Sequence, residues 1–189
     1  MKSLKSIILT VLTVAMSTLT AQAAISVGAE QTSEYIPLLK GKRVALLSNH
    51  TGMVGNEHVL DIMLRKGVNV TTIFSPEHGF RGNADAGEHV KSSIDPKTGI
   101  PIASLYDGNK REPKKEIMAK FDIIVTDIQD VGLRFYTYYC TMVDLMNAAV
   151  KYGKEFMVLH THPGPLRKTM NDQTIHEIMD CMSTVRSST

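Results

Sequence analysis

Residues 121–159 decide the fold: FDIIVTDIQDVGLRFYTYYCTMVDLMNAAVKYGKEFMVL. The run FDIIVT at 121–126 is apolar and rich in β-branched residues, which is typical of a strand buried on both faces. The next regular segment, 137–152, has the period of an amphipathic helix that ends at Gly153, with a stripe of Met142, Val143, Met146, Ala149 and Val150. A second short apolar run follows at 155–159. Strand, helix and strand in this order predict two parallel strands joined by a crossover helix.

The same alternation extends upstream. RVALLS at 43–48 and the β-branched run at 68–74 predict buried strands, and a helical pattern at 57–66 separates them. A short strand is predicted at 102–106, and Pro113 suits the first turn of a helix that runs to Lys120. We therefore expect an α/β fold: a Rossmann-like parallel sheet with helices on both faces.

Two segments between these elements predict loops. Residues 52–56 form a short connection. Residues 75–99 are polar, carry Gly79, Gly82 and Gly87, and are too long for an ordinary connection in a compact domain. We therefore expect the longer segment to be a functional loop.

The first 23 residues have the pattern of an export signal. Lys2 and Lys5 form a positive region, an apolar stretch follows at 7–15, and Ala21-Gln22-Ala23 gives the small-x-small cleavage pattern. The apolar stretch is shorter than the ~20 residues that cross a bilayer, so a cleaved signal is expected rather than a membrane anchor. Cleavage after Ala23 predicts a periplasmic or secreted bacterial protein.

Removal of 23 residues from 189 leaves 166, enough for one domain with its own core. The signal carries two of the 21 Lys and Arg residues and none of the 19 acidic residues, so the remaining chain has a formal charge of zero. This balance gives no indication of a nucleic acid or an anionic membrane as partner. Two cysteines do not form a disulfide framework, and the helical apolar pattern around Cys140 predicts that it lies in the core.

Polar side chains gather after three predicted strands. Segment 48–52 follows the first strand, segment 75–82 the second, and segment 127–136 the strand at 121–126. In parallel α/β sheets, ligands bind beyond the carboxyl ends of the strands, where such loops converge. The sequence therefore predicts a site at this edge of the sheet.

Glu77 is the first candidate for catalysis. It follows a buried strand and Pro76, so its backbone is constrained, and a partly desolvated carboxyl can serve as a general acid near neutral pH. The alternative is a helix N-cap or a surface ion pair with Arg81. Asp127 and Asp130 are candidates for the second carboxyl group that glycosidic cleavage requires, or they could cap their own loop.

Other residues near these carboxyl groups are suited to bind a sugar. The forks of Arg81 and Arg134 fit an anionic substrate group, although they could equally balance the local acids. Tyr136, Tyr138 and Tyr139 offer flat rings, of which the helical spacing places at least one in the core. Asn49 offers a donor and an acceptor for a hydroxyl or acetamido group, or it could form a turn.

A metal centre is a further alternative. Five residues of the predicted loops could converge as ligands for a hydrolytic metal: His50, His78, His89, Glu77 and Asp127. None of them has the H-E-x-x-H spacing that places two histidines on one helical face. We expect no metal.

Four segments together resemble the DUF1343 family, which includes the exo-β-N-acetylmuramidases called NamZ. They are SNHTG at 48–52, SPEHGFRGNADAGE at 75–88, DPKTGIPIASLYD at 95–107 and FDIIVTDIQDVGLRFYTY at 121–138. The likeness covers residues 39–159, and the motifs stand in the family's order and spacing.

The resemblance implies a Rossmann-like N-terminal domain and a smaller C-terminal domain with a catalytic cleft between them. It implies release of terminal N-acetylmuramic acid from peptidoglycan fragments, without a cofactor. Glu77 matches the family's catalytic glutamate, and six more residues match as cleft residues: His78, Arg81, Asp127, Gln129, Asp130 and Arg134. The lactyl carboxylate of muramic acid is an anion that an arginine fork suits.

After residue 159 the sequence departs from this resemblance, because HTHPGPLRKTMND at 160–172 has no family counterpart. The expected organisation is a signal at 1–23, a lead segment at 24–38, the Rossmann-like domain at 39–159 and an atypical tail at 160–189, frameshifted or disordered. A chain without the second domain would lack one wall of the cleft. Three functions stay open: a muramidase, active or inactivated by truncation; a metal-dependent hydrolase; and a non-catalytic muramic-acid-binding remnant.

Overall fold

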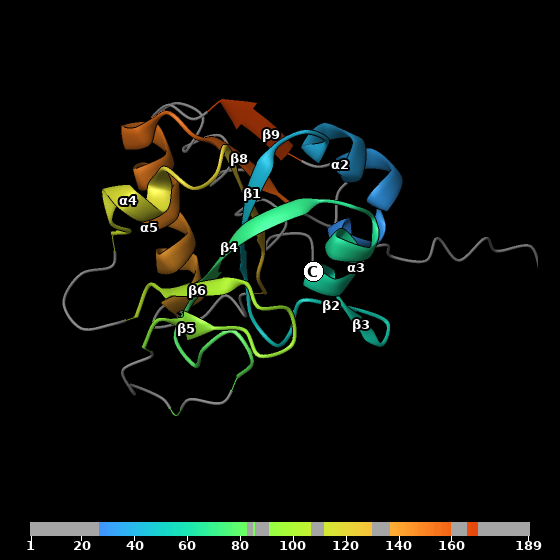
Figure 1. Cartoon of the computed structure of the whole chain (residues 1–189), viewed down its shortest axis with the longest axis horizontal. Coiled ribbons are helices and arrows are strands. Elements are labelled where there is room, and N and C mark those ends of the chain that lie inside the picture. Colours follow the sequence, from blue (N-terminus) through green and yellow to red (C-terminus); the bar gives the residue numbers. More distant parts are fainter. Residues whose placement is uncertain are drawn as a thin grey trace, which may run out of the picture.

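The structure of the chain is a computed structural model. The structure describes residues 27–82, 85, 91–106, 112–129 and 137–159, together with the backbone of 166–169. Its main sheet has the strand order β5-β6-β4-β1-β7-β8-β9 (Figure 1). These strands are β1 (Arg43–Ser48), β4 (Asn69–Ser75), β5 (Ser93–Ile94), β6 (Pro101–Ser104), β7 (Ile123–Asp127), β8 (Glu155–Val158) and β9 (Leu166–Thr169).

The five inner strands β6, β4, β1, β7 and β8 run parallel, whereas β5 and β9 pair antiparallel at the two edges. Along the chain, β4 and β6 add to one side of β1, and β7 and β8 then add to the other. The strand order therefore reverses between β1 and β7, and such a reversal is where doubly wound sheets bind ligands.

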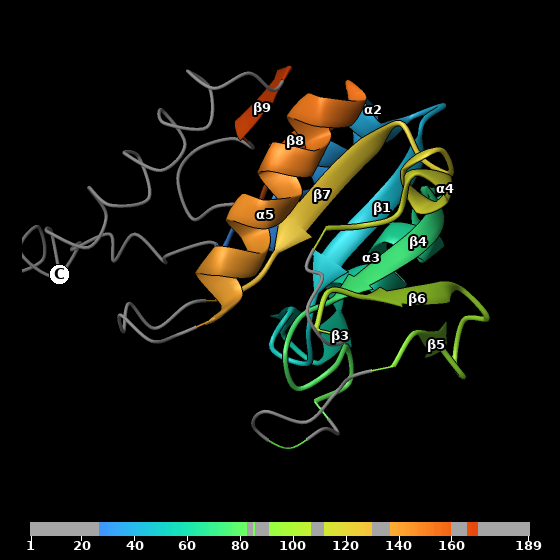
Figure 2. The same ribbon diagram turned by 90° about the vertical axis from the view of Figure 1, so that its left-hand side faces the viewer.

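Helices cover both faces of the sheet, as the sequence predicts. Helices α2 (Thr32–Leu39) and α3 (Val59–Arg65) pack on one face, and α4 (Lys115–Met118) and α5 (Thr137–Tyr152) pack on the other (Figure 2). In β1, Val44 and Leu46 point into the cluster with α2 and α3, whereas Ala45 and Leu47 point into the cluster with α5. Burial on both faces explains why the strand sequences are continuous apolar runs.

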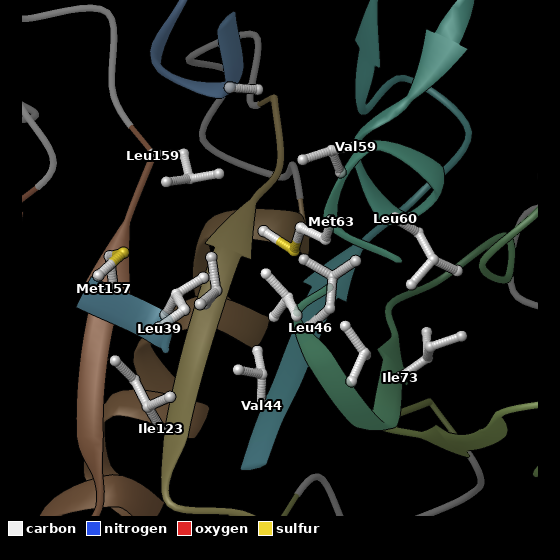
Figure 3. Packing of buried hydrophobic residues seen from close by; sticks show 14 of the residues in the cluster. Leu39, Val44, Leu46, Val59, Leu60, Met63, Ile73, Ile123, Met157 and Leu159 are labelled. Atoms are coloured by element: carbon white, nitrogen blue, oxygen red, sulfur yellow. The ribbon is translucent and has the colours of Figure 1, made fainter. Parts of the chain in front are cut away.

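Figure 3 shows the first of these clusters, which includes Val44 and Leu46 of β1 and Met63 of α3. All three side chains are fully buried. Replacing one such residue, for example Leu46, with alanine removes contacts on every side and should cost about 2–5 kcal/mol of unfolding free energy.

The segment before residue 39 contains structure that the sequence analysis did not describe. A short 3-10 helix, η1 (Gly28–Glu30), precedes α2, and Tyr35 and Leu39 of α2 are buried in the cluster with α3. The Tyr35 hydroxyl donates a hydrogen bond to the Ala29 carbonyl across 3.1 Å. Residues 27–39 therefore pack as part of the same core.

The remaining differences are local. Residues 52–58, predicted as a loop and the start of a helix, form a hairpin of β2 (Met53–Val54) and β3 (Glu57–His58), so α3 begins only at Val59. Strand β5 interrupts the predicted loop at 75–99, and α4 is shorter than the predicted helix at 113–120.

The core position predicted for Cys140 is wrong, because this side chain is exposed. Tyr138, Thr141, Met142 and Leu145 form the buried side of α5, and Cys140 lies on the other side of the helix. In the part of the chain that the structure describes, no helix is long and apolar enough to span a membrane.

Candidate active site

The predicted site lies at the carboxyl ends of three adjacent strands. The first loop, residues 49–52, follows β1, and the second loop, residues 76–82, follows β4. Because β1 pairs with both β4 and β7, these loops and the end of β7 lie at the same edge of the sheet, at the reversal of strand order. The structure thus places Asn49, Glu77 and Asp127 at one edge of the sheet.

Glu77 is largely buried, with 9% of its surface exposed. Its Oε2 accepts a hydrogen bond of 2.6 Å from the hydroxyl of Thr137, the first residue of α5. His78 follows in the left-handed region, at φ 67°, and its ring meets Tyr138 edge-on with the centroids 6.5 Å apart. A non-glycine residue in that region is under backbone strain, and such strain is concentrated at functional sites. The second loop is therefore fixed against the start of α5.

The second loop also packs closely on the first. Gly82 has φ +72°, and a Cβ at this position would lie 2.6 Å from Nδ1 of His50. No side chain fits there without displacing the His50 ring. Glycine at position 82 lets the two loops approach each other.

Asp127 ends β7 in register with Ser48, the last residue of β1. Its carboxyl is half-buried, and no group in the described part of the chain donates a hydrogen bond to it. Burial raises the pKa of Asp127 to about 6. Burial first, and then the charge of Asp127, raise the pKa of the Tyr35 phenol on α2 to about 12. Asp127 is thus a carboxyl group that can hold a proton close to neutral pH.

Asn49 is fully buried and forms the turn that the sequence left open as its alternative role. Its Oδ1 accepts hydrogen bonds from the backbone N–H of Thr51 at 3.1 Å and from the Thr51 hydroxyl at 2.7 Å. Its side chain therefore shapes the first loop.

His58 is a site residue that sequence analysis missed. Its Nδ1 accepts a hydrogen bond of 3.1 Å from the backbone N–H of Leu60, so its Nε2 carries the proton that it donates to the Asn49 carbonyl across 2.8 Å. Its ring also meets Phe80 of the second loop edge-on, with the centroids 5.0 Å apart. Burial lowers the pKa of His58 and keeps the ring neutral. One imidazole thus caps α3 and contacts both loops.

The fork of Arg81 is bonded within the protein. Its Nε and Nη2 donate to the two carboxylate oxygens of Asp95 at 3.1 and 3.0 Å, and Asp95 is fully buried. Burial alone would raise the pKa of Asp95, but hydrogen bonds from Arg81 and Thr98 outweigh it and lower that pKa. The structure therefore matches the alternative in which Arg81 balances a local acid, and the acid is Asp95 rather than Glu77.

The other predicted residues fall into three groups. Gln129 is exposed just beyond β7. Asp130, Arg134, Tyr136 and His89 lie outside the described residues. Tyr138 is buried, which confirms that one of the three tyrosines belongs to the core. The described residues contain no group of three or more His, Cys, Asp or Glu side chains placed to hold a metal.

A cavity of about 330 Å³ lies away from the loops, between α4 and the β5–β6 edge. Its walls are mostly apolar and include Thr72, Ile94, Ile102, Ile117 and Lys120. None of the predicted site residues lines it.

Residues 44–183 match the family model described as the N-terminal part of the exo-β-N-acetylmuramidase NamZ. The chain belongs to the NamZ N-terminal family. The match includes Asn49, Glu77, Arg81 and Asp127, and it extends beyond residue 159 into the segment for which the sequence predicted no family likeness.

Three relatives of this family can be compared directly. The peptidoglycan β-N-acetylmuramidase NamZ of Bacillus subtilis is 46% identical over 134 residues, which cover 70% of this chain and 32% of that protein. A crystal structure of a DUF1343 family protein from Bacteroides fragilis is 54% identical, with a TM-score of 0.61 over 73% of this chain and 35% of that one. A second from the same organism is 39% identical, with a TM-score of 0.63 over 70% and 33%. The chain thus spans about a third of the length of these relatives.

Proposed function

We propose that this chain provides the carboxyl groups of an exo-β-N-acetylmuramidase, which releases terminal N-acetylmuramic acid from peptidoglycan fragments. The observation that carries the proposal is the placement of Glu77 and Asp127 at the carboxyl edge of one sheet, within a chain 46% identical to a relative with that activity. Asp130 remains a prediction for the same set of carboxyl groups.

Two carboxyl groups are sufficient for this reaction. One donates a proton to the glycosidic oxygen as its bond to the anomeric carbon breaks, and the other, ionised, forms a bond to that carbon or activates a water molecule. Water supplies the hydroxyl group that ends on the sugar. The step needs no redox partner and no cofactor.

The lactyl carboxylate of muramic acid is the second feature of the substrate that the protein must bind. Because Asp95 occupies the Arg81 fork, we assign this carboxylate to Arg134. Arg134→Met should raise KM for a muramic acid glycoside and leave KM for an N-acetylglucosamine glycoside unchanged. An equal change in KM for both glycosides would show that Arg134 does not bind the lactyl carboxylate.

We also propose that the protein is exported and acts in the periplasm or outside the cell. The export pattern of residues 1–23 supports this location, as does the location of peptidoglycan itself. N-terminal sequencing of the protein from its host should begin at Ala24. An uncleaved Met1 would contradict the export proposal.

The catalytic proposal is tested by incubating the purified chain with a chromogenic glycoside of N-acetylmuramic acid. We expect measurable turnover that survives a chelator and that Glu77→Gln abolishes, with the melting temperature within a few degrees of the original. Turnover lost to the chelator and restored by zinc would favour the metal-dependent hydrolase. Binding of muramic acid that survives Glu77→Gln, with no turnover in either protein, would favour the non-catalytic binding domain.

A further inference from the structure

Thr137 has a contact that no sequence motif indicates. Its Oγ1 donates a hydrogen bond to Oε2 of Glu77 at 2.6 Å, across 60 residues of chain. This length falls within the roughly 2.5–2.7 Å typical of a hydroxyl that donates to an ionised carboxylate. The contact exists because α5 begins beside the second loop.

Glu77 is itself largely buried, and burial alone favours the protonated form of a carboxyl group. The hydroxyl of Thr137 acts in the opposite direction, because a hydrogen bond donated to a carboxylate favours its ionised form.

The surroundings of Asp127 have the opposite effect. Ser48 and Gly52 flank it from β1 and the first loop, and Tyr35 faces it from α2. No described residue donates a hydrogen bond to this carboxyl, and no described cation neutralises it. Burial without a donor favours the protonated form.

We propose that Thr137 is a positioning residue, whose hydroxyl holds Glu77 as an ionised carboxylate while the proton for the leaving group comes from Asp127. This inference rests on the proposed function and assigns different roles to its two carboxyl groups. It reverses the role that the sequence predicted for Glu77. Environments that separate two carboxyl groups in this way mark acid and base in glycosidases.

The proton balance is complete without another reactant. Asp127 gives its proton to the glycosidic oxygen, which keeps the bonding electrons and leaves as an alcohol. Glu77 either forms a bond to the anomeric carbon, which water then breaks, or takes a proton from the water molecule that attacks this carbon. The water hydroxyl ends on the sugar, and the other proton of the water returns to Asp127, directly in the first case and by way of Glu77 in the second.

The test uses the full chain and needs no substrate. Carboxyl ¹³C NMR of protein labelled at Asp and Glu follows the protonation of both groups, with Glu77→Gln and Asp127→Asn assigning the signals. We expect Asp127 to take up its proton at a higher pH than Glu77. Thr137→Val should move the half-protonation of Glu77 to a pH about one unit higher, and Thr137→Ser should restore it.

Thr141→Val is the matched control. It makes the same change one turn later in α5, where the hydroxyl donates to the Thr137 carbonyl rather than to Glu77. Thr141→Val should leave the pH at which Glu77 is half-protonated unchanged. Glu77 taking up its proton above Asp127 would overturn the division of roles, and an unchanged Glu77 titration in Thr137→Val would overturn the role of Thr137. Neither outcome depends on turnover, so a failed glycosidase assay would be distinguishable from both.

Discussion

Ser48 and Asp127 stand side by side as the last residues of β1 and β7, the two strands between which the order of the sheet reverses. The first loop turns back over this pair, so that a Cβ at Gly52 would fall 3.1 Å from a carboxylate oxygen of Asp127. The chain thus covers a carboxyl group at the position where doubly wound sheets bind their ligands.

Asp127→Asn should make the protein more stable near neutral pH while removing its proposed proton donor. The folded pKa of about 6 lies above the ordinary value of 3.8, so this carboxyl stabilises the fold below pH 4 and loses that contribution as pH rises through 6. Asparagine removes this loss, and the variant should gain on the order of 3 kcal/mol of unfolding free energy at pH 7. Urea unfolding at pH 4 and pH 7 measures it. Asp122→Asn, which breaks the pair with Arg43, should lower stability, and a loss for Asp127→Asn as well would contradict the assignment.

His58→Gln should change how stability responds to acid. The folded pKa of His58 lies below the ordinary 6.5 because of burial, so its contribution is present above pH 6.5 and is lost as pH falls towards the folded value. In His58→Gln, this part of the loss of unfolding free energy at low pH should be absent. Loss of its two hydrogen bonds should also cost about 1–3 kcal/mol at neutral pH. Equal slopes of unfolding free energy against pH, from pH 7 to 5, would rule out this role.

Gly82→Ala should be more harmful than Gly99→Ala. Both glycines have a left-handed backbone, at φ +72° and +73°, which costs alanine about 1–2 kcal/mol. Only at Gly82 does the added methyl group also meet His50, whereas nothing lies within 4 Å at Gly99. The difference in unfolding free energy, about 1–3 kcal/mol, isolates the contact between the two loops. Similar losses in both variants would mean that His50 moves aside freely.

Arg81→Met should destabilise the fold rather than weaken substrate binding. It leaves the fully buried Asp95 carboxylate without its partner, which costs about 3–5 kcal/mol. Arg43→Met, at an exposed pair with Asp122, should cost much less. Adding Asp95→Asn to Arg81→Met should recover part of the loss in a double-mutant cycle. Unchanged stability with a raised KM would instead show that Arg81 binds the substrate.

The sequence predicted the parallel sheet because strands buried on both faces are continuous apolar runs, as in RVALLS and FDIIVT. It also predicted at which edge of the sheet the site lies, because Glu77 and Asp127 come directly after such strands. Two-residue strands such as β5 have no period to detect, and α2 contains Pro37, which hides its helical pattern.

Contacts between distant residues account for what the sequence could not predict. Arg81 has its partner 14 residues away, and Glu77 has Thr137 60 residues away, so no local pattern joins either pair. His58 acts through hydrogen bonds to main-chain groups. Such bonds require no particular side chain at the partner position, so they leave no motif in the sequence. The sequence analysis placed His58 inside the helical pattern at 57–66, whereas in the structure it is the N-cap of α3, which begins at Val59.

The most direct test of the proposed site is to locate the bound sugar. N-acetylmuramic acid titrated into the ¹⁵N-labelled chain should shift the backbone signals of Asn49 to Gly52, of Glu77 to Gly82 and of Asp127, at the carboxyl edge of the sheet. N-acetylglucosamine, which lacks the lactyl group, should shift them less. Shifts confined to the cavity between α4 and the β5–β6 edge, with those loop signals unmoved, would contradict the site.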